Sequence, residues 1–303
     1  MATQKKDLVY KDFVFDLNTS HSIEIGRFFI DHLKDKKKSL NVFTANVYDA
    51  ILLKEEIGWF YPDLRINHLP DWETLPYDQI SPHPELISER LLALHKITQN
   101  EFDINLLPIT TALHFLPPKT YIEKFSFDFK VNQVVDIDAF KIRLNENGYL
   151  NVDKVLSPGE FAIRGSIIDI FPMGSIIPYR IDFFGNEIDS IRTFDVDTQR
   201  GLYPTKKIKL LPAREFPLDK DGISQFRNNY RSKIDGDLSR SKPYKSISKG
   251  TPFAGVEWYL PLFFDKTETI FDYMNPDDIS LLLGDISKAS QDFHTEAHSR
   301  YRL

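Results

Sequence analysis

The first forty-odd residues alternate strand-like and helix-like segments. Residues 12–17 and 40–44 are short apolar runs, and between them residues 22–33 carry a broad apolar face at helical spacing. The polar residues at 18–20 precede this face and are of the kind that cap helices. The pattern therefore predicts strand, helix and strand in succession, which is the opening of an α/β domain.

A proline-rich loop then gives way to a helix that we expect to start near Pro84. Ile87, Leu91 and Leu94 follow at the spacing of a buried helical stripe. A short strand at 104–108 and a second helix-like run come before two consecutive prolines, 117 and 118, which are typical of a linker.

After this linker the pattern changes to short alternating strands separated by turns, with one helix predicted at 138–145. The clearest element is a hairpin over residues 179–194, whose turn is Gly185-Asn186. A final apolar run at 279–283 reads as a buried strand. We therefore predict a small α+β domain, residues 118–205, inserted between the two pieces of an α/β domain, residues 1–117 and 206–303.

Composition narrows the class of protein. The 303 residues have 42% hydrophobic and 27% charged side chains, as in an ordinary globular protein. The formal net charge of −6, and an inserted segment with ten Lys and Arg against thirteen Asp and Glu, argue against a nonspecific DNA clamp. The chain has no cysteine, no run long enough to span a membrane and no signal peptide, so we expect a cytoplasmic protein that does not contact membranes.

Catalytic chemistry is not indicated by the motifs. A phosphate-binding loop needs closely spaced glycines and a lysine, but after the predicted strand at 12–17 no glycine occurs until Gly26. Gly284-Asp285-Ile286 resembles a magnesium-binding strand end without the catalytic glutamate. His294 and His298 are spaced to share a metal, but a solvated helix explains them more simply. We expect neither an enzyme nor a bound cofactor or metal.

Three long segments carry a family resemblance. They are LPDWETLPYDQISPHPELISERLLAL (69–94), GEFAIRGSIIDIFPMGSIIPYRIDFFGNEIDSIRTFDVDTQR (159–200) and ISKGTPFAGVEWYLPLFF (247–264). In this order they resemble the N-terminal region of the bacterial transcription-repair coupling factors. The resemblance spans nearly the whole chain. The repair helicase subunit UvrB has a similar inserted domain but keeps an intact phosphate-binding loop, which favours the coupling factors.

The resemblance implies a fold and a set of partners. The fold is a degenerate RecA-like α/β domain, like domain 1 of UvrB, in two sequence pieces with an inserted UvrB-type α+β interaction domain. The implied partner is UvrA, the damage-sensing ATPase. RNA polymerase and DNA are implied partners of other regions of the full-length protein, whose motor is an ATP- and Mg-dependent DNA translocase. The family's C-terminal region is expected to mask the UvrA-binding surface.

Motif by motif, the resemblance assigns UvrA binding to Arg164, Arg180 and Phe184. The strand pattern agrees, because if Tyr179, Ile181 and Phe183 face the core, the residues between them face solvent. Arginines and an exposed aromatic ring are typical of interface hot spots. In the alternative interpretation Phe184 packs beneath its own turn and the arginines pair with Asp182, Glu187 or Asp189. A DNA-binding or helicase-accessory domain with residual nucleotide affinity is the alternative function.

Overall fold

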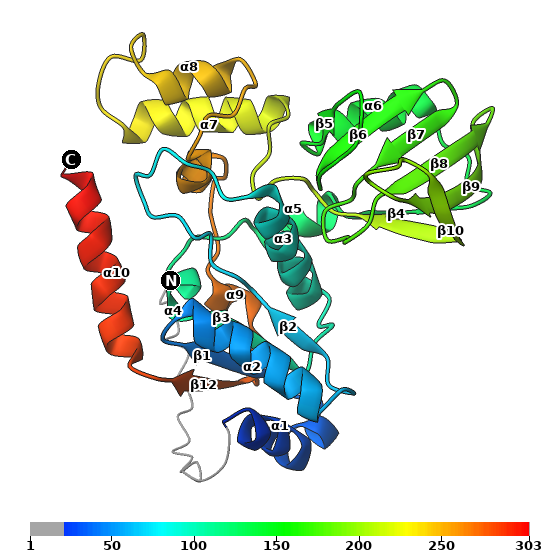
Figure 1. Ribbon diagram of the computed structural model, residues 1–303. Coiled ribbons are helices and arrows are strands. Elements are labelled where there is room, and N and C mark those ends of the chain that lie inside the picture. The colour runs from blue at the N-terminus through cyan, green and yellow to red at the C-terminus, as the bar shows by residue number, and fades with distance from the viewer. Residues whose placement is uncertain (1–20, 303) are drawn as a thin grey trace. The chain divides into compact units, whose positions relative to one another are not determined.

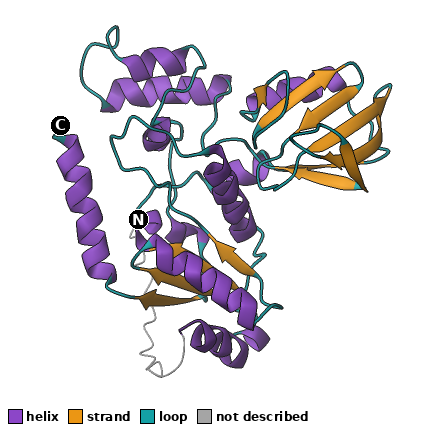
Figure 2. Cartoon of the chain, viewed as in Figure 1, coloured by secondary structure: helices purple, strands orange, loops and turns teal. Residues whose placement is uncertain are grey.

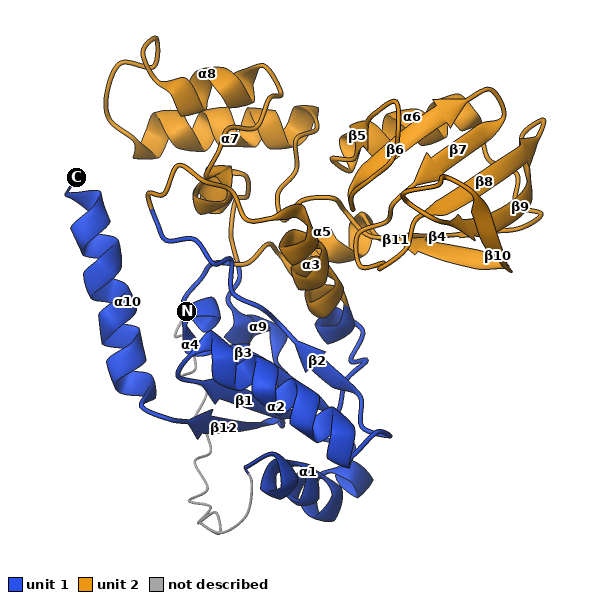
Figure 3. Ribbon diagram, in the orientation of Figure 1, with its two compact units in different colours: residues 1–76, 96–115, 268–303 blue, residues 77–95, 116–267 orange. Residues whose placement is uncertain are grey.

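The computed structural model describes residues 21–302, so the strand predicted at 12–17 lies outside the described residues. The chain divides into two compact units, which Figure 3 colours separately. Unit 1 comprises Met1–Pro76, Lys96–Phe115 and Glu268–Leu303, and unit 2 comprises Tyr77–His95 and Leu116–Thr267. Residues 206–267 thus group with unit 2, and the predicted domain boundaries at 118 and 206 stay predictions.

Unit 1 is built on a four-stranded parallel sheet in the order β12-β1-β3-β2 (Figure 1). Every residue of the two central strands is buried, as expected for parallel strands covered on both faces. The strands predicted at 40–44, 104–108 and 279–283 are confirmed, but the last was predicted to be buried and is instead a partly exposed edge strand, with Leu282 exposed. The strands are β1 (Leu40–Thr44), β2 (Ile66–His68), β3 (Ile104–Pro108) and β12 (Ile279–Leu283).

Helices α1 (His21–His32) and α2 (Val47–Phe60) form one hydrophobic cluster with the sheet. The predicted apolar face comprised Ile23, Phe28, Phe29, Ile30 and Leu33. Phe29 and Leu33 of this set are buried, Ile30 is exposed, and the buried Ile25 was not part of the prediction. At Gly26 any side chain would collide with the ring of Tyr61, so the glycine permits this close approach. The remaining helices of unit 1 are η1 (Lys34–Lys36), α4 (Ile109–Ala112), α9 (Ile270–Tyr273) and α10 (Ile286–Tyr301).

Unit 2 holds a six-stranded sheet in the order β10-β9-β8-β7-β6-β5 and a two-stranded sheet, β11-β4. Figure 2 shows these strands together with helix α6 (Ile137–Glu146). One hydrophobic cluster includes residues of α6 and of both sheets, among them Phe140, Ile181 and Ile208. The strands are β4 (Phe127–Lys130), β5 (Leu150–Asn151), β6 (Glu160–Arg164), β7 (Ile167–Ile170), β8 (Tyr179–Phe184), β9 (Glu187–Phe194), β10 (Gly201–Thr205) and β11 (Lys207–Leu210).

The rest of unit 2 is helical and has its own aromatic core. Phe216, Phe226 and Phe263 are buried together, with ring centroids 4.6 Å apart for Phe216–Phe263 and 4.7 Å apart for Phe226–Phe263. Helices α7 (Lys220–Lys233), α8 (Lys242–Ser248) and η2 (Val256–Leu262) contribute to this core. Helix α5 (Lys119–Lys124) and most of α3 (Pro84–Thr98) also belong to unit 2, but buried residues of both join the cluster with the two sheets.

The mixed α/β class with a parallel sheet is therefore confirmed. The hairpin predicted at 179–194 is present as β8 and β9, and the helix predicted at 138–145 is present as α6. None of the described helices has the length and hydrophobicity needed to cross a membrane.

Candidate partner-binding surface

The three predicted contact residues all lie on one face of the six-stranded sheet. Residues directly opposite one another on neighbouring strands point to the same face. Arg164 on β6 is opposite Ile167 on β7, which is opposite Asp182 on β8. Arg180 and Phe184 alternate with buried residues of β8 and so share the face of Asp182. We call this face the outer face of the sheet.

Phe184 is the most exposed of the three. Its side chain is at the end of β8, immediately before the Gly185-Asn186 turn, and the residue is 83% exposed, whereas Phe183 is 6% exposed. Gly185 has a φ of 60°, which a residue with a Cβ adopts only with strain, and no heavy atom lies within 4 Å of a Cβ built there. The interpretation in which Phe184 packs beneath its own turn is therefore wrong.

Arg164 also lies at the surface. It is the last residue of β6 and is exposed, and its Nη2 donates to the backbone oxygen of Asp153 at 2.7 Å. Strands β6 and β8 are both neighbours of β7, so they lie roughly 10 Å apart across the sheet. Arg164 and Phe184 thus belong to the same face without touching one another in the described contacts.

Arg180 differs from the expectation, because its guanidinium is already paired inside the domain. Its Nε and Nη2 donate to the two carboxylate oxygens of Asp169 at 2.7 and 2.8 Å, and its Nη1 donates to the backbone oxygen of Gln199 at 3.3 Å. The side chain is 20% exposed and that of Asp169 is 2% exposed. The hydrogen bonds from Arg180 to Asp169 raise the pKa of Arg180. Asp182 contributes only a weaker charge interaction to that pKa, and it accepts hydrogen bonds from Ser190 and Arg192 rather than from Arg180.

The outer face has its own small apolar layer at the end where Arg180 lies. Ala162, Phe171 and Phe194 are buried there together with Val155. The guanidinium carbon of Arg180 lies 5.2 Å from the centre of the Phe194 ring, within the range of a cation–π contact. Arg180 therefore anchors this layer, while Arg164 and Phe184 lie toward the opposite, uncovered end of the strands.

A second polar group on the outer face was missed by the sequence reasoning. Arg192 donates to Asp182 Oδ2 at 2.8 Å and to Ser190 Oγ at 3.0 Å, and the side chains of the ion pair are 46% and 24% exposed. Arg192 is directly opposite Arg180 in the register of β8 and β9. Strand β9 does not alternate strictly, because its register with β8 shifts between Asp182 and Phe183, so neither the direction of Arg192 nor its partner follows from the sequence of β9 alone.

The turn after the central strand β1 is the place in a parallel sheet of this kind where a phosphate-binding loop would lie. That turn contains Ala45 and Asn46, with no glycine or lysine before Lys54. The Asn46 side chain accepts a hydrogen bond from the backbone N–H of Asp49 at 2.8 Å and so caps α2 itself.

Two further candidates for metal chemistry lie on helix α10. Asp285 caps α10 by accepting a hydrogen bond from the backbone N–H of Lys288 at 2.9 Å. His294 and His298 stack with ring centroids 6.2 Å apart on the exposed side of the same helix. Among residues 21–302, no group of three or more His, Cys, Asp or Glu side chains is arranged to hold a metal ion.

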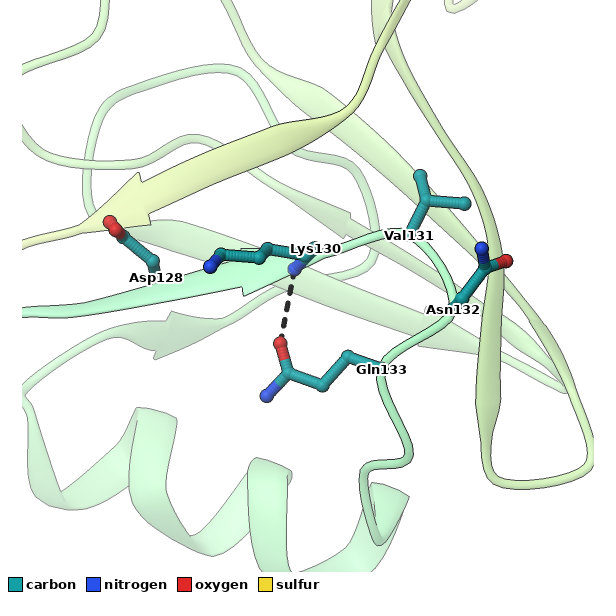
Figure 4. A pocket seen from close by; sticks show the side chains of 5 residues that line it. All are labelled: Asp128, Lys130, Val131, Asn132 and Gln133. Atoms are coloured by element: carbon teal, nitrogen blue, oxygen red, sulfur yellow. Dashed lines mark hydrogen bonds between the residues drawn. The ribbon is translucent and has the colours of Figure 1, made fainter.

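One open hollow lies beside β4 in unit 2, and Figure 4 shows its lining. The backbone N–H of Lys130 donates to Gln133 Oε1 at 3.0 Å across it. Its lining consists of Asp128, Lys130, Val131, Asn132 and Gln133. With one carboxylate, one ammonium and no aromatic ring, the hollow lacks the features of a nucleotide site.

Comparison with known proteins agrees with this geometry. Residues 127–216, which include the whole six-stranded sheet, match the model of the UvrB interaction domain. The transcription-repair-coupling factor of Haemophilus influenzae is 44% identical over 234 residues, which are 77% of this chain and 20% of that protein. The Escherichia coli protein of the same name is 38% identical over 261 residues, 86% of this chain and 23% of its own length, and the Bacillus subtilis protein is 28% identical over 268 residues, 84% and 23%.

The fold and the matched domain together define a UvrB-like chain that contains a UvrB interaction domain. It belongs to the transcription-repair-coupling factor family, of which it represents the UvrB-like N-terminal region. The chain spans about a fifth of the length of the relatives it matches.

Proposed function

We propose that this chain recruits UvrA in transcription-coupled nucleotide excision repair. In this proposal the full-length protein displaces RNA polymerase stalled at a DNA lesion with an ATP- and Mg-dependent motor elsewhere in its sequence. The present region then brings UvrA to the lesion, contributes no catalysis and binds no cofactor. The parallel sheet of unit 1 is a RecA-like sheet whose phosphate loop has degenerated, for which the self-capped turn at Asn46 is the supporting observation.

The observation that carries the proposal is the exposure of Phe184 on the outer face of a UvrB interaction domain. Burying a phenylalanine side chain stabilises it by roughly 1.5–3 kcal/mol relative to leaving it in water. Binding of the Phe184 ring in an apolar depression on a partner would provide this free energy. Arg164 lies on the same face and has N–H groups that can donate to a partner carboxylate.

Arg180 takes a different part in the proposal than the sequence predicts. The Nε and Nη2 of Arg180 donate to Asp169, so the side chain stabilises the outer face of the sheet. Only N–H groups that these two hydrogen bonds do not use can donate to a partner. Truncation of Arg180 would leave the carboxylate of Asp169 buried without its partner, which costs stability as well as affinity.

The test is titration of UvrA with the chain and with three single variants. We expect Phe184→Ala and Arg164→Ala each to weaken UvrA binding by about 2 kcal/mol, or roughly thirtyfold, with an unchanged melting temperature. Arg180→Ala should weaken binding and also lower the melting temperature. Leu202→Ala, an exposed apolar residue on the edge strand β10, is the matched control and should bind normally. Normal UvrA affinity of folded Phe184→Ala and Arg164→Ala proteins would refute the proposal.

A further inference from the structure

Residues 219–250 of unit 2 differ in charge from the rest of the chain. They contain eight Lys and Arg against four Asp, while the chain as a whole has a net charge of −6. The segment forms the helices α7 and α8, which pack on each other through the aromatic core around Phe226. A basic pair of helices in an acidic protein is unexpected for a surface that only needs to be soluble.

The basic residues of α7 form one row. Lys220, Arg227 and Arg231 are seven and four residues apart, which places them within about 40° of one another around the helix. All three side chains are exposed, and the row is roughly 16 Å long. The fourth position of this row is Ser224, so no acidic side chain interrupts it.

Two guanidiniums of this row are held in place by a tyrosine of α8. Arg231 Nε donates to Tyr244 Oη at 2.8 Å and Arg227 Nε donates to the same oxygen at 3.4 Å. The guanidinium carbon of Arg231 also lies 5.6 Å from the centre of the Tyr244 ring. The hydrogen bond from Arg227 and that from Arg231 lower the pKa of Tyr244. Each arginine keeps its terminal Nη groups for a ligand, because only Nε is used.

Helix α8 continues the basic surface. Lys242 and Lys245 are three residues apart on α8, and Lys249 follows four residues later as the residue that ends the helix, so the three fall on one side within about 60°. All three are exposed, and this side lies away from the buried Ile247. Tyr244 lies about 100° around the helix from Lys245 and contacts Arg227 and Arg231, so it borders the lysine row on the side that faces α7. We call these six residues and Tyr244 the α7–α8 basic surface.

The four acidic residues of the segment offset only part of this surface. Asp235 is exposed in the loop between α7 and α8, and the pKa of Asp237 is lowered by its hydrogen bonds to Ser239, with a smaller contribution from the charge of Lys245. Asp219 accepts the backbone N–H of Gly222 and caps α7. Asp237 accepts the backbone N–H of Ser239 and pairs with Arg240 at 3.5 Å. Asp221 follows Lys220 by one residue and so lies about 100° around the helix from the basic row.

Surface chemistry separates two kinds of anionic partner. Between residues 204 and 270, all of them described, no large apolar side chain is exposed. A protein interface ordinarily has apolar anchors at its centre and few lysines. Surfaces that bind nucleic acid are polar and rich in Lys and Arg that neutralise phosphates. The charge and the missing anchors therefore favour a nucleic acid over an acidic protein.

We propose that the α7–α8 basic surface binds the phosphate backbone of double-stranded DNA. The site is on a different part of unit 2 from the outer face of the sheet and does not depend on the proposed binding of UvrA. Because the contacts are to phosphates rather than to base edges, binding is independent of sequence and falls steeply with salt.

The experiment measures binding of the full chain to a labelled 20-base-pair duplex by fluorescence anisotropy at several salt concentrations. We expect Lys242→Gln, Lys245→Gln and Lys249→Gln, combined in one protein, to weaken binding at least about tenfold at low salt. The slope of log K against log salt should fall in magnitude by about 2 to 3, because each lost phosphate contact removes about 0.9. The same three positions changed to arginine should retain binding.

A matched control tests whether charge alone is responsible. Lys34, Lys36 and Lys37 are equally exposed but belong to unit 1, and their change to glutamine removes the same charge. This control protein should bind the duplex like the unchanged chain. An equal loss in the control, undiminished binding by the α8 variant, or no binding by the unchanged chain at low salt would overturn the proposal. Tighter binding of a polyglutamate peptide than of the duplex to the same lysines would overturn it in favour of an acidic protein partner.

Discussion

Phe184 and Arg180 are four residues apart on one strand, yet their surroundings give them opposite roles. Phe183 is buried in the core, whereas the ring of Phe184 is exposed to water. Exposure of an apolar ring is unfavourable, and a binding partner that covers the ring would remove this cost. The guanidinium of Arg180 is bonded to a buried carboxylate, so its loss is first a loss of folding free energy. A binding assay alone would treat the two residues alike, and a melting temperature separates them.

A single histidine makes the stability of unit 1 sensitive to pH. His68, at the end of β2, has a pKa lowered to about 4 by burial, with a smaller contribution from the charge of Lys54. No described residue accepts or donates a hydrogen bond at its Nε2. Between pH 6.5 and 4 the unfolded chain binds a proton at His68 that the folded chain does not. The contribution is therefore fully present above about pH 6.5 and is lost as the pH falls toward 4.

We expect the free energy of unfolding to drop by about 1–2 kcal/mol from this residue between pH 7 and pH 5. The His68→Gln variant has no group to protonate there and should show a correspondingly shallower pH dependence. Urea unfolding of both proteins at pH 7, 6 and 5 measures the difference. If the two pH profiles run parallel, His68 is not the source of the effect.

At the scale of elements, one buried ion pair links α3 to the segment that leads into α7. Arg90 Nε and Nη2 donate to the carboxylate of Glu215 at 2.6 and 3.2 Å, and the two side chains are 0% and 2% exposed. Water reaches neither charge, so this ion pair compensates part of the cost of burying both.

The Glu215→Gln variant should destabilise the chain by about 3–5 kcal/mol, because it removes the charged partner of this buried ion pair while the guanidinium of Arg90 stays buried. The Arg240→Gln variant breaks the pair with Asp237, whose side chains are 89% and 56% exposed, and should change stability by less than about 1 kcal/mol. Chemical denaturation followed by circular dichroism compares them. Similar shifts in the two variants would show that burial does not decide the strength of the pair.

The elements that could be predicted from the sequence are those whose pattern is local. The hairpin of β8 and β9 follows from alternation and a Gly-Asn turn, and α3 follows from a proline start and an apolar stripe. The partner of Arg180 could not be predicted, because Asp169 lies on another strand and only the register brings the two together. The same limit hid the link between Arg231 and Tyr244, which join two helices through side chains thirteen residues apart.

The net charge of the whole molecule is negative, although the segment that forms α7 and α8 is basic. A net charge of −6 and an acidic inserted segment argue against a DNA clamp, and for the sheet of unit 2 that reasoning stays a prediction. The reasoning does not extend to α7 and α8, because phosphate binding depends on local rows of cations and not on the sum over the chain. One chain can therefore combine a protein-binding sheet with a separate basic surface.

At the scale of the full-length protein, the resemblance to the coupling factors predicts that the C-terminal region masks the outer face of the sheet until RNA polymerase is engaged. A masked protein must first expose the face, so its measured affinity for UvrA is reduced by the fraction of molecules that are open. The present chain covers about a fifth of such a protein and contains the face without the predicted mask. We therefore expect it to bind UvrA at least about tenfold more tightly than the full-length protein, which corresponds to about 1.4 kcal/mol of masking.

Isothermal titration of UvrA with each protein measures this ratio, and Phe184→Ala should weaken both. Equal affinities of the fragment and the full-length protein would rule out masking while leaving the binding surface itself intact.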